Sequence, residues 1–261
     1  MNGRNVNIIA DDYGLSPTVD SAIRMLMGCE AIDGTSCITV FPEWMAQANL
    51  LRQQASRSKS QIGLHLTLTD FRPASGRGDE EPMPKLRRLL ISNLSSTLHC
   101  EDIKAELDAQ LERFIEGIGK LPDFIDGHQH VHFLPIVRRW LEMRVDRLRH
   151  DNRLPWLRGA PSIAFASGTR TKTKVAVVRM LANGFDRQMT AAGYVVRGPL
   201  VGFYNWAKPN KFSDVLQLVE NKSPKGAVLM CHPGWVDETL ISRDTMVTAR
   251  PYEFEQLMRR M

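Results

Sequence analysis

Three of the chain's seven histidines fall within one short stretch, Asp126-Gly127-His128-Gln129-His130-Val131-His132. If this stretch is the end of a β-strand, alternate side chains point the same way, so Asp126, His128, His130 and His132 share one face. One carboxylate and several imidazoles at a strand end suit a divalent metal ion and the groups that orient its ligands. The competing interpretation is a surface histidine cluster with no bound ion.

Outward from this stretch, apolar strand-like segments alternate with helical segments along the chain. Strands are predicted over residues 5–10, 35–40, 61–67, 123–128, 194–197 and 227–231. Helices are predicted over residues 17–28, 43–56, 85–94, 101–117, 134–149, 174–192 and 212–221, with a last one from Pro251 onward. Residues 69–84 predict a long loop or an insertion, and residues 150–170 are left unassigned. This order predicts an α/β fold with a largely parallel sheet, and roughly seven parallel strands favour a TIM-like (β/α) barrel over an open sheet.

The composition is that of an ordinary soluble globular protein, and we expect one domain over residues 1–261. Hydrophobic residues make up 43% of the chain and charged residues 24%, which is enough for a sizeable core. No segment approaches the roughly 18 apolar residues of a membrane-spanning helix. The apolar run from Val6 to Ala10 is too short for a signal peptide, and the cysteines form no C-x-x-C pair. We therefore expect a cytoplasmic protein with free thiols.

The net charge is +5, and the basic residues gather in residues 138–158 and 170–179. Such runs are commonly solvated helix faces. The alternative is attraction to an anionic substrate or to a membrane surface, which would make the protein peripheral to the inner face of a membrane. Nucleic acid is not an expected partner, because no zinc-finger spacing or basic strand with interleaved aromatic residues is present. The oligomeric state is left open, with a homodimer as one expectation.

Residues able to do chemistry follow the predicted strands at their carboxyl ends. Asp11 and Asp12 follow the first strand, His65 lies at the end of the third, and His232 follows the last. Because parallel strands end at one edge of a barrel, these side chains should meet those of the Asp126–His132 stretch. Taken singly, each motif also has an ordinary reading: a capping turn, a core histidine or a His-Pro-Gly turn.

A catalytic mononuclear metal site needs about three protein ligands and one open position. Asp12, His65 and His128 supply one carboxylate and two imidazoles, which suits zinc and also cobalt, nickel or magnesium. Asp11 would then take a proton from a metal-bound water, and His232 would give a proton to a leaving group or bind an oxyanion. Adjacent strand residues diverge, so the turn at Asp11 and Asp12 must bend, as Gly14 permits.

Four motifs, in order along nearly the whole chain, resemble those of the YdjC-like carbohydrate deacetylases. They are Ala10-Asp11-Asp12-Tyr13-Gly14-Leu15-Ser16, Gly63-Leu64-His65-Leu66-Thr67-Leu68-Thr69, Asp126 to His132, and Cys231-His232-Pro233-Gly234. The resemblance implies a distorted (β/α) barrel that removes N-acetyl groups from amino sugars with the help of a metal. It also implies that Asp12, His65 and His128 are the ligands, that Asp11 is the base and that His232 is its catalytic partner. Asp126, His130, His132 and Tyr13 would orient the ligands or face the substrate.

Gln129 departs from the pattern of this family. Many members have a histidine there, and the Gly-His-Gln-His form is similar to the hopanoid-biosynthesis-associated branch. This likeness implies an N-acetylglucosaminyl hopanoid glycolipid as the substrate. A chito-oligosaccharide is the alternative substrate within the same family.

Two further hypotheses stay open at the level of sequence. A metal phosphoesterase would use His130 and His132 as ligands of a second ion. A non-catalytic glycolipid-binding barrel would keep a structural metal only, although such a site has no need of a base like Asp11.

Overall fold

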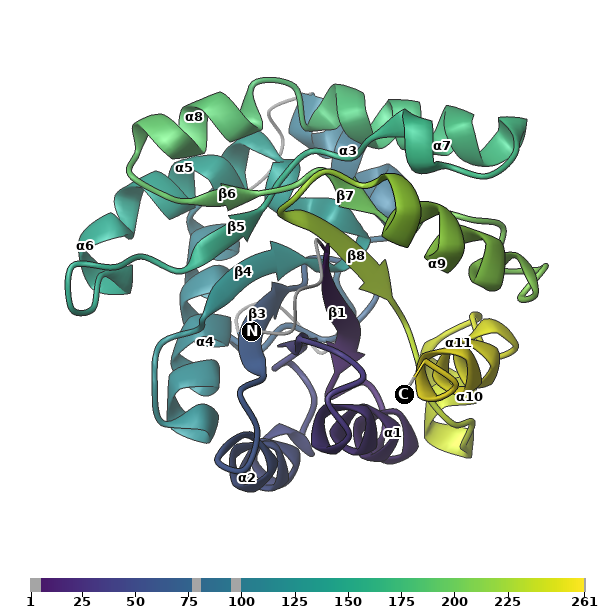
Figure 1. Ribbon diagram of the computed structural model, residues 1–261. Coiled ribbons are helices and arrows are strands. Elements are labelled where there is room, and N and C mark those ends of the chain that lie inside the picture. The colour runs from purple at the N-terminus through teal and green to yellow at the C-terminus, as the bar shows by residue number, and fades with distance from the viewer. Residues whose placement is uncertain (1–5, 77–80, 95–99, 261) are drawn as a thin grey trace.

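The computed structural model describes residues 6–76, 81–94 and 100–260, and eight parallel strands form its central sheet (Figure 1). The order across the sheet is β6-β5-β4-β3-β2-β1-β8-β7, and every pairing is parallel. The strands are β1 (Val6–Tyr13), β2 (Gly34–Cys37), β3 (Gln61–Leu66), β4 (Phe124–Gly127), β5 (Trp156–Arg158), β6 (Val196–Arg197), β7 (Leu200–Val201) and β8 (Ala227–Cys231). The prediction of a parallel α/β barrel is confirmed.

Roughly seven strands is a close count of the eight observed. The two shortest are β6 and β7, and the sequence analysis places a strand at β6 but none at β7. Only Gly198 and Pro199 separate them, so they follow each other along one stretch of backbone. The Gly159 N–H donates to the Arg197 carbonyl at 2.8 Å, and the Leu200 N–H donates to the Ala160 carbonyl at 3.1 Å. Because β7 also pairs with β8, this stretch bends the sheet into a nearly closed barrel.

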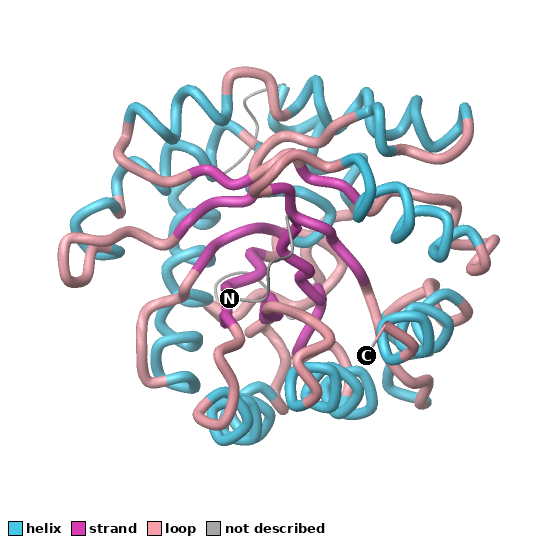
Figure 2. Tube along the Cα trace, in the orientation of Figure 1, coloured by secondary structure: helices cyan, strands magenta, loops and turns pink. Residues whose placement is uncertain are grey.

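Helices surround the strands (Figure 2). They are α1 (Pro17–Gly28), α2 (Trp44–Ala55), α3 (Leu86–Leu94), α4 (Cys100–Ile118), α5 (Pro135–Met143), α6 (Val145–Leu148), α7 (Thr169–Leu181), α8 (Phe185–Ala191), α9 (Lys211–Lys222), α10 (Glu238–Arg243) and α11 (Ala249–Met258). Two short 3₁₀ helices span His128–Phe133 and Ile163–Phe165. None of the helices in the described ranges has the length and apolar content needed to cross a bilayer. The four cysteines are free thiols, as predicted.

Several predicted boundaries are wrong, each for a local reason. The predicted helix over residues 174–192 is two helices, because Gly184 adopts a left-handed conformation with φ of 74° between α7 and α8. The predicted helix over residues 134–149 breaks at Arg144, which separates α5 from α6. The unassigned segment 150–170 supplies β5. In the predicted loop over residues 69–84, positions 77–80 lie outside the described residues.

The turn from β1 into α1 sets the first edge of the barrel. Gly14 has a φ of 97°, and a side chain there would place a Cβ atom 2.3 Å from the Ile38 carbonyl oxygen, so no other residue fits. Ser16 caps α1 by accepting the Val19 N–H, and Pro17 opens the helix, as the sequence predicts. Asp20 holds the turn from inside the helix, because its Oδ1 accepts the Gly14 N–H at 2.5 Å.

Asp20 predicts a pH dependence of stability. Its side chain is fully buried, and burial raises its pKa from 3.8 to about 8 despite the hydrogen bond from Gly14. A raised folded-state pKa means that its contribution is complete below pH 3.8 and is lost as the pH rises toward 8. We expect Asp20→Asn to remove this loss and to raise the free energy of unfolding at pH 8 by about 2 kcal/mol or more.

Urea unfolding of metal-free wild type and variant at pH 5 and pH 8 measures this difference. Asp214→Asn is the control, because Asp214 is an exposed carboxylate on α9. If Asp20→Asn keeps the wild-type difference between the two pH values, Asp20 is not the group responsible.

Candidate functional site

An irregularity in β1 turns the two adjacent aspartates toward different partners. The strand continues to Tyr13, beyond the predicted end at Ala10, but its register against β2 shifts between Ala10 and Tyr13. Asp12 there adopts a φ of 68°, a conformation that aspartate tolerates better than most residues. Asp11 and Asp12 are each 2% exposed. The bend expected at this turn therefore involves Asp12 as well as Gly14.

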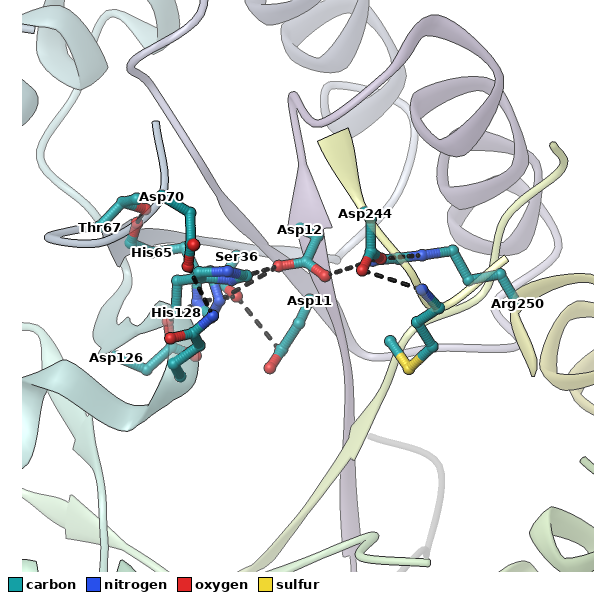
Figure 3. Close-up of polar contacts among 12 residues, drawn as sticks. Asp11, Asp12, Ser36, His65, Thr67, Asp70, Asp126, His128, Asp244 and Arg250 are labelled. Atoms are coloured by element: carbon teal, nitrogen blue, oxygen red, sulfur yellow. Dashed lines mark hydrogen bonds and ion pairs between the residues drawn. The ribbon is translucent and has the colours of Figure 1, made fainter. Parts of the chain in front are cut away.

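Asp12 faces two histidines from other strand ends (Figure 3). Its Oδ1 lies 3.4 Å from His65 Nε2 and 3.1 Å from His128 Nδ1. Their ligand atoms all lie within 4.8 Å of one another, as one metal ion requires. The structure thus brings together the three residues that the sequence proposes as ligands, from β1, β3 and the end of β4.

Asp126 and Ser36 orient the imidazole of His65. Asp126 Oδ1 lies 2.6 Å from His65 Nδ1, and Ser36 Oγ lies 3.0 Å from the same nitrogen. This contact leaves Nε2 directed at Asp12, in the carboxylate–histidine arrangement typical of metal ligands. Burial lowers the pKa of His65, but the charge of Asp126 and bonds to Asp12 and Asp126 outweigh it and raise the pKa to about 10.

Arg158, which the sequence analysis misses, connects the aspartates beneath the cluster. Its guanidinium binds both oxygens of Asp11 at 2.6 Å and reaches Asp126 Oδ2 at 2.5 Å. Its side chain is fully buried at the end of β5. Burial raises the pKa of Asp11, but the Arg158 charge outweighs it, and the net pKa is lowered. Asp11 is therefore ionised and fixed in position at neutral pH. The feature of the sequence that could have pointed to Arg158 is its position directly after the apolar pair Trp156-Leu157.

Two overlapping groups of ligand atoms in the described residues are close enough to hold an ion. One is Asp12, His65 and His128, and the other is Asp11, His65 and Asp126. In the second group, the guanidinium of Arg158 already occupies both carboxylates. The first group combines one carboxylate and two imidazoles, with His128 partly exposed. This donor set fits zinc or a similar divalent ion, so the first group is the better candidate.

Arg250 of α11 holds the other oxygen of Asp12. Arg250 Nη2 binds Asp12 Oδ2 at 2.7 Å and Asp244 Oδ2 at 2.6 Å, with its side chain 1% exposed. Burial raises the pKa of Asp12, but Arg250 and the two histidines lower it well below its usual range. Arg250 thereby leaves Asp12 Oδ1 directed at the histidines. No local pattern in the sequence marks Arg250 as part of the site.

His232 stands at the rim, directly after β8. Its backbone N–H donates to Glu253 Oε2 at 2.5 Å, and Glu253 Oε1 accepts from the Tyr204 hydroxyl at 2.5 Å. The imidazole lies edge-on to Trp206, with ring centroids 5.3 Å apart. His232 is close enough to Asp11 for its charge to contribute to lowering the pKa of that aspartate. Burial raises the pKa of Glu253.

The prediction that Asp126, His128, His130 and His132 alternate along one strand is wrong. The strand ends at Gly127, and residues His128–Phe133 form a 3₁₀ helix in which Gln129 and His130 have φ of 50° and 63°. His132 is buried, with its ring 3.9 Å from that of Phe133. His130 packs 5.4 Å from the Phe203 ring, and burial lowers its pKa to about 3. Neither of these two histidines belongs to a candidate metal group in the described chain.

Tyr13 lies apart from the cluster, although the sequence analysis places it in the site. Its hydroxyl donates to the Gln47 carbonyl at 2.8 Å and accepts from Arg24 at 2.6 Å. It therefore links β1 to α1 and α2.

A cleft of 280 Å³ opens beside His128. Asp70 on its wall accepts from Gln129 at 2.9 Å and pairs with Lys85 at 2.8 Å. Its lining residues are Leu15, Asp70, Phe71, Lys85, His128, Gln129, Ser242, Arg243, Asp244 and Thr245. The cleft therefore joins one candidate ligand to an opening that is rich in polar groups.

Comparisons with known proteins agree on one family. The family model described as YdjC-like protein matches residues 5–260. The carbohydrate deacetylase of Halalkalibacterium halodurans is 25% identical over 260 residues, which cover 96% of this chain and 93% of that protein. The chitooligosaccharide deacetylase of Proteus mirabilis is 39% identical over 155 residues, which cover 53% of this chain and 58% of that protein.

A solved structure supports the fold independently. It is described as a putative cellobiose-phosphate cleavage protein of Enterococcus faecalis V583, and it superposes with a TM-score of 0.64 at 21% identity. The alignment covers 97% of this chain and 89% of that protein, so the whole barrel is shared. With the family match over residues 5–260, the conclusion is that the chain belongs to the YdjC-like protein family.

Proposed function

We propose that this protein removes the acetyl group from an N-acetylated amino sugar and uses one divalent metal ion held by Asp12, His65 and His128. The observation that carries the proposal is the pairing of that donor set with an adjacent ionised aspartate, Asp11. The deacetylase relatives make the chain a hydrolase that acts on amide bonds. Zinc is the ion we propose, because its usual ligands include both imidazole and carboxylate.

The residues around the ion divide the work of amide hydrolysis. An ion held there would polarise the acetyl carbonyl and lower the pKa of a bound water. Asp11 accepts the proton of the attacking water. Its Oδ1 accepts from both Arg158 and Ser36, whereas Oδ2 accepts from Arg158 alone among the described residues and keeps a second lone pair. His232, from the opposite rim, gives a proton to the amine as the C–N bond breaks. The products are acetate and a free amino sugar.

For the substrate, we propose an N-acetylglucosaminyl hopanoid glycolipid, with a chito-oligosaccharide as the alternative. Gln129 lies in the cleft wall, where it donates to Asp70, and this position supports a link between Gln129 and the choice of substrate. The name of the Proteus mirabilis relative favours the alternative. The phosphoesterase hypothesis has no such support. It needs His130 and His132 as ligands of a second ion, and neither belongs to a candidate metal group in the described residues.

Acetate release from the two substrates tests the proposal. We expect the zinc-loaded protein to release acetate from both and to have the higher kcat/KM for the glycolipid. A higher kcat/KM for the chito-oligosaccharide would assign the alternative substrate. Release from neither, with the metal bound, would contradict the deacetylase itself.

A further inference from the structure

Helix α7 lies at the outer edge of the molecule and is covered by little else (Figure 1). Of its thirteen residues, only Thr171 and Val175 are buried. Val177 is 47% exposed and Met180 is 69% exposed. The inner side of α7 packs on the barrel through Val175, so these two side chains stand on the side that is open to a partner.

The exposed residues of α7 follow a helical pattern. Thr173, Ala176, Val177 and Met180 are spaced i, i+3, i+4 and i+7, so they lie on one face, opposite Thr171 and Val175. We call these four residues the outer face of α7. It is a narrow face of small and apolar side chains that points away from the barrel.

Cations border the outer face of α7 on both sides. At 3.6 residues per turn, Arg170 and Lys174 flank it on one side, and Lys172 and Arg179 flank it on the other. All four are exposed, and no ion pair joins them to a carboxylate in the described chain. Arg179 also donates to the Pro161 carbonyl at 2.9 Å, so the other three are the cations that are free to contact a partner. The sequence has no aspartate or glutamate from Asn152 through Phe185. An apolar centre between two rows of cations is the layout of a helix that lies flat in a bilayer surface.

We propose that α7 docks on the surface of an anionic lipid bilayer. Its cations would contact lipid phosphates while Val177 and Met180 enter the boundary of the acyl chains. A symmetric contact with a second copy would bring the same cations face to face and is disfavoured by their repulsion. A nucleic acid would satisfy the cations but would leave Met180 without an apolar partner.

The position of α7 relates this surface to the site. Val175, on its inner side, packs in the same cluster as Phe203, and the Phe203 ring lies 5.4 Å from that of His130. One layer of side chains therefore separates the docking helix from the stretch that carries His128. A bilayer as the partner deepens the proposed function, because it would hold the glycolipid substrate near the site, and this link rests on the proposed function. The docking surface itself follows from the residues of α7 alone.

Co-sedimentation with lipid vesicles tests the proposal without any acetylated glycolipid. We expect wild type to bind vesicles that contain phosphatidylglycerol, to bind pure phosphatidylcholine weakly, and to be released by high salt. Lys172→Glu with Lys174→Glu should weaken binding by at least about tenfold. The control is Arg57→Glu with Lys59→Glu, which changes the charge equally at exposed positions between α2 and β3.

The apolar contribution has its own pair of variants. Met180→Asp should weaken vesicle binding, whereas Leu50→Asp on α2, where the side chain is 42% exposed, should not. Acetate release from a soluble chito-oligosaccharide should be unchanged in all variants, which shows that they fold. Absence of wild-type binding would overturn the proposal, and so would an equal loss in the controls. Binding of DNA, or self-association, that depends on α7 without vesicle binding would overturn it as well.

Discussion

Arg158→Gln is expected to lower the free energy of unfolding by about 3–5 kcal/mol. Arg158 is the fully buried cation that binds Asp11 and Asp126 at 2.5–2.6 Å. Glutamine would fill part of the space but would leave two carboxylates without a counter-charge in the interior. The cost comes from those unpaired charges, because an intact buried ion pair itself contributes little net stability.

A matched control comes from the same protein. Arg144 also binds one carboxylate through two nitrogens, at 2.7 and 2.5 Å from Asp108, but those side chains are 27% and 33% exposed. Water can solvate Asp108 once its partner is gone, so we expect Arg144→Gln to cost about 1 kcal/mol or less. Urea unfolding of both variants measures the difference. Equal losses would contradict the role given to burial.

The pH dependence of the Arg158 variant has a definite sign. The pKa of Asp11 is lowered in the folded wild type, since the Arg158 charge outweighs burial. A lowered pKa stabilises the fold above the ordinary value of 3.8 and loses that effect as the pH falls through the folded-state pKa. Without Arg158 this contribution is absent. The defect should therefore be large at neutral pH and smaller in acid.

Asp11→Asn and Asp12→Asn are both expected to lower activity strongly, but for different reasons. Asparagine tolerates a positive φ, so the strained position of Asp12 accepts it without rebuilding β1. Loss of the Asp12 carboxylate should weaken metal binding by at least about a hundredfold, more than the usual loss when a group that merely orients a ligand is removed. Asp11→Asn should keep the ion, because Asp11 is not one of the three proposed ligands. Its carboxylate is already paired with Arg158.

Metal content after dialysis separates the two variants. We expect about one ion per chain in wild type and in Asp11→Asn, and much less in Asp12→Asn. Two ions per wild-type chain would favour the phosphoesterase hypothesis. Loss of the ion in Asp11→Asn alone would move the metal to the other candidate group, with Asp126 as a ligand.

The rule that parallel strands share one carboxyl edge accounts for most of what the sequence predicts here. It places Asp12, His65 and His128 together although they are far apart in the chain, because each follows or ends a recognisable apolar strand. The same rule yields the parallel barrel. It works because strand direction and residue spacing are local properties that the sequence displays directly.

The parts that the sequence does not reveal depend on contacts between distant segments. Arg158 and Arg250 join the site through carboxylates that lie 147 and 238 residues away along the chain. The turn at Gln129 and His130 depends on two positive φ angles, which a run of alternating histidines does not announce. Extending the strand through that run therefore gives His130 and His132 the wrong orientation. The site's ligands are marked by local patterns, whereas the arginines that hold them are not.

The most direct measurement is acetate release from an N-acetylated amino-sugar substrate by metal-loaded wild type and metal-loaded Asp11→Asn. If Asp11 accepts the proton of the attacking water, the rate in Asp11→Asn falls by a factor of about 10²–10⁴ while the ion stays bound. Acetate release at the wild-type rate from metal-loaded Asp11→Asn would contradict this account.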